Sequence, residues 1–303
     1  MAPSARSQTS SSLPTTIPQL VPPADITNVP PPAIDSDKKK ILERLREDFL
    51  ESSSIFSSDD KVRTSEISWC SDACLLRYLR ACKWNYSDAR ERIEETLKWR
   101  RSYGPHLIDP QEIEEECYTG KIYLNGFDSQ GSPVIYMKPR NENTKPSRRH
   151  IRNVVFLLER AIRLMPENVE KMVIVVDFAG SSTRTNPGLG IAKEFLTVLG
   201  NHYPERLGRA FLVNTPWFFW TFWKLISPFI DPVTRSKIRF VDLKTQNNVQ
   251  PNQEKGDWAN LLHYIPAEQL EADFGGKLDY EFKFDDYWRT LLSTTQEPRC
   301  IEK

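Results

Sequence analysis

The sequence predicts an α/β fold that follows a block of helices. Between residues 37 and 105 the chain is rich in Lys, Glu and Leu, and its apolar residues recur at helical spacing. After residue 105, short apolar runs alternate with helical patterns. One run, Met172-Val-Ile-Val-Val, is apolar at every position, as expected of a central strand covered on both faces. With 303 residues, 39% of them hydrophobic, the chain can form one large domain or two closely packed ones.

The first 36 residues differ in composition from the rest. They hold eight of the chain's 22 prolines together with six Ser and four Thr. Such a segment cannot bury enough apolar surface to offset its ordering entropy, so we expect an unstructured tail over 1–36. The remaining expected units are a helical lobe over 37–110, an α/β lobe over 111–290 and a second tail over 291–303.

The expected elements follow in order. A first helix is marked by apolar residues between 41 and 50, a second is capped by Ser71 and Asp72, and a third runs from Ser87 to the stop signal Gly104-Pro105. Strand-like runs then lie at 121–124, 134–138, 172–178, 210–214 and 238–242. Helical patterns lie at 150–165 and 188–201, and a hairpin turn at 128–131 joins the first two strands.

Charge and motifs exclude several classes of protein. The 41 basic and 41 acidic residues balance, which argues against a nucleic-acid binder. No window is long and apolar enough to span a membrane. The five cysteines form no CxxC pair, and with four scattered histidines no metal site is expected. Asp177 ends a buried strand, a common catalytic position, but no base or nucleophile accompanies it, so we expect no enzyme and no cofactor.

An aromatic segment at 217–229 stands out. Seven of the 33 aromatic residues fall within it, and Pro216 and Pro228 delimit a short helix. Its aromatic side chains cannot all face one core. They indicate either a buried core helix or a helix with one face on an internal cavity and the other on a membrane, where tryptophan is favoured.

The next segment has features of a phosphate site. Pro232 suits the first turn of a helix and leaves neighbouring N–H groups unpaired. Thr234 supplies a hydroxyl, and Lys237 supplies an ammonium group on the same face. A solvated surface lysine is the alternative for Lys237.

Several stretches together resemble the CRAL-TRIO lipid-binding family. They are Leu75-Leu-Arg-Tyr-Leu-Arg-Ala-Cys-Lys-Trp84, Lys98-Trp-Arg100, His202-Tyr-Pro-Glu-Arg-Leu-Gly208, Pro228-Phe-Ile-Asp-Pro-Val-Thr234 through Lys237, and Phe274-Gly-Gly276. They occur in family order over about 45–280. The likeness is strongest to fungal phosphatidylinositol transfer proteins of the pleiotropic-drug-resistance subgroup.

The resemblance implies a fold and a set of site residues. The expected fold is a helical N-terminal lobe plus an α/β lobe with a mixed, mostly parallel sheet and a large apolar lipid cavity closed by a gate helix. The gate falls at 217–230 and includes Trp217, Phe218, Trp220, Phe222, Trp223 and Phe229. Contacts to the phosphatidylinositol headgroup are implied for Lys83, Glu205, Thr234 and Lys237. Cys82 departs from the family, which often has arginine there.

A second departure concerns the other ligand of the family. Members that also carry phosphatidylcholine surround its headgroup with two tyrosines, a serine and a threonine, and the corresponding residues here are Leu124, Ile135, Met172 and Ile174. A zwitterionic headgroup buried against four apolar side chains lacks partners, at a cost of several kcal/mol. We therefore expect an apolar second ligand, a sterol, in place of phosphatidylcholine.

The resulting expectation is a protein that exchanges phosphatidylinositol and a second hydrophobic lipid between membranes. The alternative is a scaffold that presents phosphatidylinositol to a lipid kinase with little net transfer. Expected partners are the two lipids, a transient membrane surface and, in the alternative, the kinase. The expected location is cytoplasmic with peripheral association to endoplasmic reticulum, lipid droplets or cell periphery.

Overall fold

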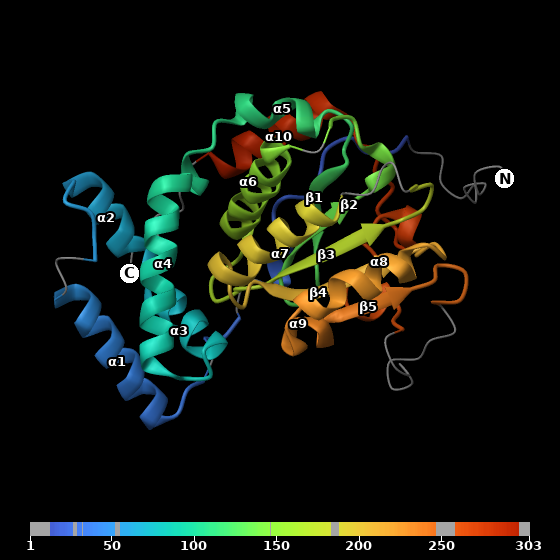
Figure 1. Ribbon diagram of the computed structural model, residues 1–303. Helices are drawn as coiled ribbons and strands as arrows, with labels where there is room; N and C mark the ends of the chain where they lie inside the picture. The colour runs from blue at the N-terminus through green and yellow to red at the C-terminus, as the bar shows by residue number, and fades with distance from the viewer. Residues whose placement is uncertain are drawn as a thin grey trace.

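The computed structural model shows a helical lobe beside an α/β lobe (Figure 1). The structure describes residues 13–26, 29–31, 33–51, 55–145, 147–182, 188–246 and 258–296, without the side chains of Asp25, Leu50, Glu51, Leu189 and Phe222. The expected fold class, with its helical front and mostly parallel sheet, is confirmed.

The helical lobe comprises α1 (Ser36–Glu51), α2 (Asp60–Trp69), α3 (Asp72–Ala81) and α4 (Tyr86–Tyr103). It has its own core, in which Leu45, Leu79 and Ile93 are fully buried. Helix α4 begins after Asn85, whose side chain caps the N–H of Asp88. It ends at Gly104, whose φ of 63° is the left-handed conformation that glycine adopts freely.

A five-stranded sheet forms the centre of the second lobe, in the order β1-β2-β3-β4-β5. The strands are β1 (Ile122–Phe127), β2 (Pro133–Met137), β3 (Met172–Asp177), β4 (Leu207–Val213) and β5 (Ile238–Val241). β1 and β2 form an antiparallel hairpin, and the other neighbours are parallel. The turn closes where the N–H of Gly131 donates to the carbonyl of Asp128. The five predicted strands and this turn are confirmed.

Helices cover one face of the sheet and a looped segment covers the other. α6 (Arg148–Leu164), α7 (Leu189–His202) and α8 (Phe219–Ile226) lie in front of the sheet in Figure 1. On the opposite face, Phe274 stacks on Tyr136 and Tyr264 packs at a tilt against Phe211, each at 5.2 Å between ring centroids. The remaining helices are α5 (Pro110–Cys117), α9 (Pro232–Ser236) and α10 (Phe284–Thr295).

The N-terminal segment is not a free tail where the structure describes it, which corrects the expectation for 1–36. Thr15 pairs with Tyr280, the N–H of Gln19 donates to the Asn125 side chain at 2.9 Å, and Leu20 is buried. Its proline-rich composition suggested disorder, but the sheet edge and the C-terminal region supply its partners. Residues 1–12 lie outside the described residues.

The C-terminal boundary also differs from the expectation of a tail beginning at 291. Helix α10 continues to Thr295, and Leu291 and Thr295 are buried. Arg160 holds the end of this helix by donating to the carbonyl and hydroxyl of Thr295, both at 2.9 Å. Residues 297–303 lie outside the described residues.

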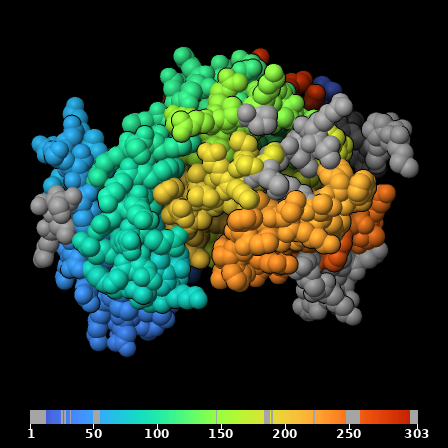
Figure 2. Space-filling view, viewed as in Figure 1, coloured from blue at the N-terminus to red at the C-terminus, as the bar shows by residue number. Residues whose placement is uncertain are grey.

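The two lobes meet along α4 and α7, which touch in teal and yellow in Figure 2. The ring of His202 stacks on Trp99 with 4.1 Å between centroids, and its Nδ1 lies 3.1 Å from the hydroxyl of Thr96. Beside them, Arg100 pairs with the largely buried Glu159 of α6 at 2.9 Å. Aromatic stacking and an ion pair thus fix the helical lobe to α6 and to the end of α7.

Candidate ligand-binding site

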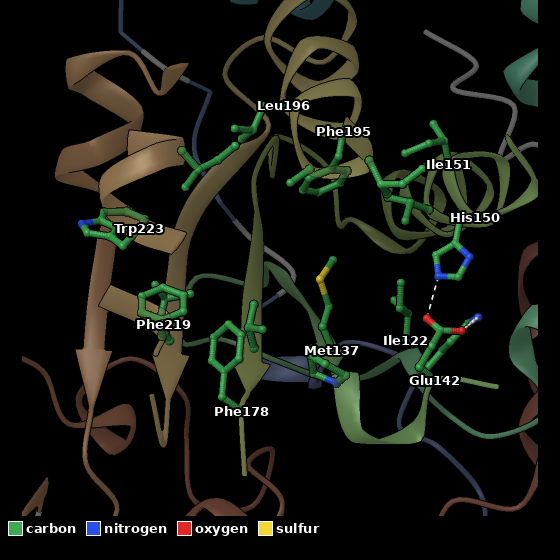
Figure 3. A pocket seen from close by; sticks show the side chains of 18 of the residues that line it. Ile122, Met137, Glu142, His150, Ile151, Phe178, Phe195, Leu196, Phe219 and Trp223 are labelled. Carbon is green, nitrogen blue, oxygen red and sulfur yellow. Dashed lines mark hydrogen bonds and ion pairs between the residues drawn. The ribbon is translucent and has the colours of Figure 1, made fainter. Parts of the chain in front are cut away.

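An apolar cavity of about 270 Å³ lies between the sheet and the helices α6, α7 and α8 (Figure 3). It sits at the carboxyl ends of the parallel strands, where open α/β sheets usually bind ligands. Its volume is near the lower end of small-molecule pockets, which hold roughly 300–1,000 Å³. A whole two-chain lipid therefore needs the walls to move apart.

The floor of the cavity is a single row of side chains across four strands. Ile122 on β1 pairs in register with Met137 on β2, Met137 with Val176 on β3, and Val176 with Leu212 on β4. Because alternate residues of a strand share a face, the regular sheet places these four side chains side by side under the helices.

Three helices form the walls and the roof. Helix α6 contributes Ile151 and Val154, and helix α7 contributes Phe195 and Leu196. Helix α8 closes the third side with Phe219, Trp223 and Ile226, seen opposite α6 in Figure 3.

One end of the cavity is polar. Lys121, Glu142 and His150 line it, and Figure 3 shows His150 and Glu142 facing each other across from α8. His150 Nε2 lies 2.7 Å from Glu142 Oε2, and Lys121 Nζ donates to Glu142 Oε1 at 2.7 Å. Burial raises the pKa of Glu142, but the hydrogen bonds from His150 and Lys121 outweigh burial and lower that pKa to about 2.

A buried carboxylate completes this polar cluster. Glu116, at the end of α5, is fully buried and accepts hydrogen bonds from Lys121, from Thr144 at 2.9 Å and from Arg149 at 2.9 Å. Glu116, Glu142 and His150 lie close enough together to hold a metal ion. Lys121 Nζ already contacts both carboxylates, however, so the positive charge that they need is supplied by the chain itself.

The four residues predicted around the second ligand do not line the cavity. Leu124, Ile135 and Ile174 form the next row on the same face of the sheet, paired Leu124 to Ile135 and Ile135 to Ile174. That row lies two residues, ~6.6 Å, further along the strands from the cavity floor. Met172 lies a further two residues away, and all four side chains are buried in the core.

The four predicted headgroup residues lie outside the cavity too. Lys237 Nζ is 3.8 Å from Glu205 Oε2, close to the amino ends of β4 and β5. Thr234 lies on α9, three residues before Lys237, and its N–H donates to the Asp231 side chain at 2.9 Å. Lys83 is exposed in the α3–α4 turn, and within the described ranges no hydrogen bond or ion pair joins it to the other three.

The aromatic segment has both buried and exposed apolar side chains. Phe219 and Ile226 are buried and Trp223 half-buried, all lining the cavity. Elsewhere in the segment, Trp217 is 84% exposed, Trp220 41% and Phe229 57%. Phe218 is half-buried, and the side chain of Phe222 lies outside the described part. The exposed residues Trp217, Trp220, Leu225 and Phe229 are called the outer face below.

Asp177 is occupied by structural contacts. Its carboxylate pairs with Arg140 and accepts hydrogen bonds from the side chain of Asn214 at 2.9 Å and from the N–H of Ala179 at 3.0 Å. Together these fix the loops that follow β3 and β4.

Sequence reasoning missed the polar end of the cavity. Its members come from α5, the residue before β1, the segment after β2 and the first turn of α6. In the sequence each of these residues resembles an ordinary charged residue of the surface. The available signal was the position of Lys121 directly before an apolar strand. In the structure Lys121 is only 3% exposed.

The fold and an apolar cavity under an aromatic helix define the class of protein, and the comparisons agree. The model of the CRAL/TRIO domain matches residues 118–276, and that of the CRAL/TRIO N-terminal domain matches 39–95. The chain belongs to the CRAL/TRIO family.

Relatives give a more detailed comparison. The phosphatidylinositol transfer protein PDR17 of Saccharomyces cerevisiae is 33% identical over 92% of this chain and 82% of its own length. A CRAL-TRIO domain-containing protein of Schizosaccharomyces pombe is 45% identical over 76% of this chain, which spans about a fifth (21%) of that relative. The crystal structure of Sfh5 superposes with a TM-score of 0.61 at 18% identity, covering 84% of this chain and 93% of Sfh5.

Among the residues that the structure describes, none of the helices has the length and apolar character required to cross a bilayer.

Proposed function

We propose that this protein transfers phosphatidylinositol and a second hydrophobic lipid between membranes. The observation that carries the proposal is the apolar cavity roofed by an aromatic segment that also exposes two tryptophans. The names of the relatives support it, because PDR17 of Saccharomyces cerevisiae and CSR1 of Eremothecium gossypii are both phosphatidylinositol transfer proteins.

The physical problem that such a protein solves is the exposure of acyl chains to water. Two chains hold roughly 30 methylenes, each worth ~0.8 kcal/mol against water. An apolar cavity solvates the acyl chains nearly as well as the bilayer does. The free energy of exchange is therefore close to zero, and the protein lowers only the activation barrier for transfer. Helix α8 serves as the gate: closed, it lines the cavity; open, its apolar residues enter the membrane surface. Its movement also provides the room that a two-chain lipid needs.

For the second ligand we propose a sterol. No polar side chain replaces the choline-binding set at Leu124, Ile135, Met172 and Ile174, and the row of these residues next to the cavity floor is apolar. If the cavity extends along the sheet when a lipid binds, the lipid contacts only apolar side chains in that region. Such surroundings favour a sterol over phosphatidylcholine.

The headgroup site is tested by the double variant Lys237→Ala with Glu205→Ala. Loss of this pair should abolish phosphatidylinositol transfer between vesicles and spare sterol binding, because neither residue lines the cavity. Equal loss of both activities would mean that the pair is structural. Lys171→Ala, an exposed lysine near the same end of the sheet, is the matched control.

One observation favours the alternative of a scaffold for a lipid kinase. The proposed headgroup residues lie outside the cavity, and Lys83 is exposed, so an inositol ring held there is within reach of a second protein. Vesicle transfer without kinase, compared with stimulated phosphoinositide output, separates the two functions. In both cases we propose a cytoplasmic protein that visits membranes.

A further inference from the structure

The proposed function leaves the polar end of the cavity without a role in ligand binding. Apart from Lys121, Glu142 and His150, the described residues that line the cavity are apolar. Burying two carboxylates, a lysine and a histidine in such a place is unfavourable unless they are paired, and here they are. A purely hydrocarbon ligand would gain nothing from this end.

We propose that Glu142 and His150 form a subsite for the single hydroxyl group of a neutral lipid, with the apolar body of that lipid directed toward Phe219 and Trp223. The proposal rests on the proposed function, since it names how the second ligand is held. It also sets the ligand's direction: hydroxyl toward α6, hydrocarbon toward the gate.

The charges of the cluster decide the chemistry of the ligand group. Lys121 and Arg149 offset Glu116 and Glu142, and Arg149 also pairs with the exposed Glu115, so the cluster has no surplus positive charge to offer. A phosphate would meet the Glu142 carboxylate. A quaternary ammonium would compete with Lys121, which already bonds to both carboxylates. A hydroxyl brings no charge and can donate to a lone pair of Glu142 Oε2, whose partner among the described residues is His150.

Geometry holds the subsite rigid. The backbone N–H groups of Asn143 and Thr144 donate to Glu142 Oε1 at 3.0 and 2.9 Å, which fixes that carboxylate. The ring of His150 is fixed between Glu142 Oε2 at 2.7 Å and Glu116 Oε2 at 3.2 Å. A ligand hydroxyl therefore meets a site that is already ordered, and binding loses little side-chain entropy.

The test compares dehydroergosterol, which has a free 3-hydroxyl, with dehydroergosteryl acetate, in which that group is blocked. Binding is read by energy transfer from tryptophan, because Trp223 lines the cavity. The wild-type protein should prefer the free sterol by ~10-fold, the ratio that one hydrogen bond of ~1.4 kcal/mol produces. His150→Phe removes the hydrogen bond that holds Glu142 Oε2 in place, so it should reduce this ratio to near one. Phe195→Leu, in the apolar wall, should weaken both ligands alike and keep the ratio.

Equal binding of the two sterols by the wild type, or a ratio that persists in His150→Phe, overturns the proposal. The wild-type ratio does not depend on any variant folding. Phosphatidylinositol transfer is measured in parallel: its presence with no sterol discrimination defeats this proposal alone, and its absence defeats the proposed function. A competition arm with dioleoylglycerol identifies the hydroxyl's source, since displacement of dehydroergosterol from wild type but not from His150→Phe points to diacylglycerol.

Discussion

Two of the proposed headgroup residues adopt an unusual backbone. Lys83 has a φ of 51° and Glu205 a φ of 59°, in the left-handed region that residues with a Cβ rarely occupy. Such a conformation costs of order 1–3 kcal/mol and persists where the surroundings impose it. At Glu205 the turn from α7 into β4 imposes it and brings the carboxylate toward Lys237.

Replacing Glu205 by glycine separates stability from function. Glycine adopts a positive φ without strain, so Glu205→Gly should unfold at equal or higher urea concentration than Glu205→Ala. Both variants should lose phosphatidylinositol transfer to the same degree. Urea unfolding and vesicle transfer check this, and a glycine variant that retains transfer would remove Glu205 from the headgroup site.

At the same scale, the polar cluster marks a limit of sequence reasoning. Lys121 and Glu142 are 21 residues apart and bond at 2.7 Å, yet neither has a neighbour in sequence that indicates burial. Thr234 and Lys237 could be proposed because their spacing near a helix start has chemical meaning. The meeting of Glu116, Glu142 and His150 depends on how α5 and α6 pack, which no spacing encodes.

At the scale of elements, α8 shows why its sequence is aromatic all round. Phe219, Trp223 and Ile226 line the cavity, while Trp220 of the same helix and Trp217 just before it are exposed. The ring centroid of Trp220 also lies 4.9 Å from that of the buried Phe240 on the edge strand β5. Trp220 is therefore anchored to the edge of the sheet while part of its ring stays exposed.

Removing one exposed tryptophan tests the membrane role of the outer face. Trp217→Ser should leave thermal stability nearly unchanged, because the side chain is 84% exposed, and should weaken binding to vesicles several-fold. Leu107→Ser is the matched control, since Leu107 is 74% exposed on a different part of the surface. Vesicle co-sedimentation measures both, and equal losses would show that general hydrophobicity, not this face, drives binding.

The strands were predictable, and the helices α2, α5 and α10 were not. The run from Met172 onward ends at Asp177, one residue from the predicted end, because continuous burial on both faces leaves a clear signal. Helix α2 was missed because its apolar periodicity is weak. Helix α5 was missed although Asp109 and Pro110 form a recognisable start.

At the scale of the molecule, the contact between lobes contains a titratable group. Burial, followed by the nearby Arg92 and Arg100, lowers the pKa of His202 to about 4. Its ordinary value is ~6.5, so the unfolded chain takes up the proton first as the pH falls. The contribution of neutral His202 to the free energy of unfolding is complete above pH ~6.5 and is lost progressively as the pH falls toward 4.

The variant His202→Phe should reduce this acid sensitivity. Phenylalanine keeps a ring against Trp99 but cannot take up a proton. Urea unfolding at pH 7 and pH 5 should show a smaller loss of stability for the variant than for the wild type. An identical loss in both proteins would assign the acid sensitivity to other groups.

The N-terminal segment shows what composition alone misses at this scale. Its prolines predicted disorder, and local sequence offers no partner for it. Its order comes from contacts with residues more than 100 positions away, such as Gln19 with Asn125. Long-range pairing of this kind follows from the finished sheet and not from the segment itself.

Native mass spectrometry tests the central claim most directly. The protein is incubated with vesicles that contain equal amounts of phosphatidylinositol, phosphatidylcholine and ergosterol, and then re-isolated. We expect one phosphatidylinositol or one sterol per chain and little phosphatidylcholine. Phosphatidylcholine bound as readily as phosphatidylinositol, or a chain that emerges without lipid, would contradict the account.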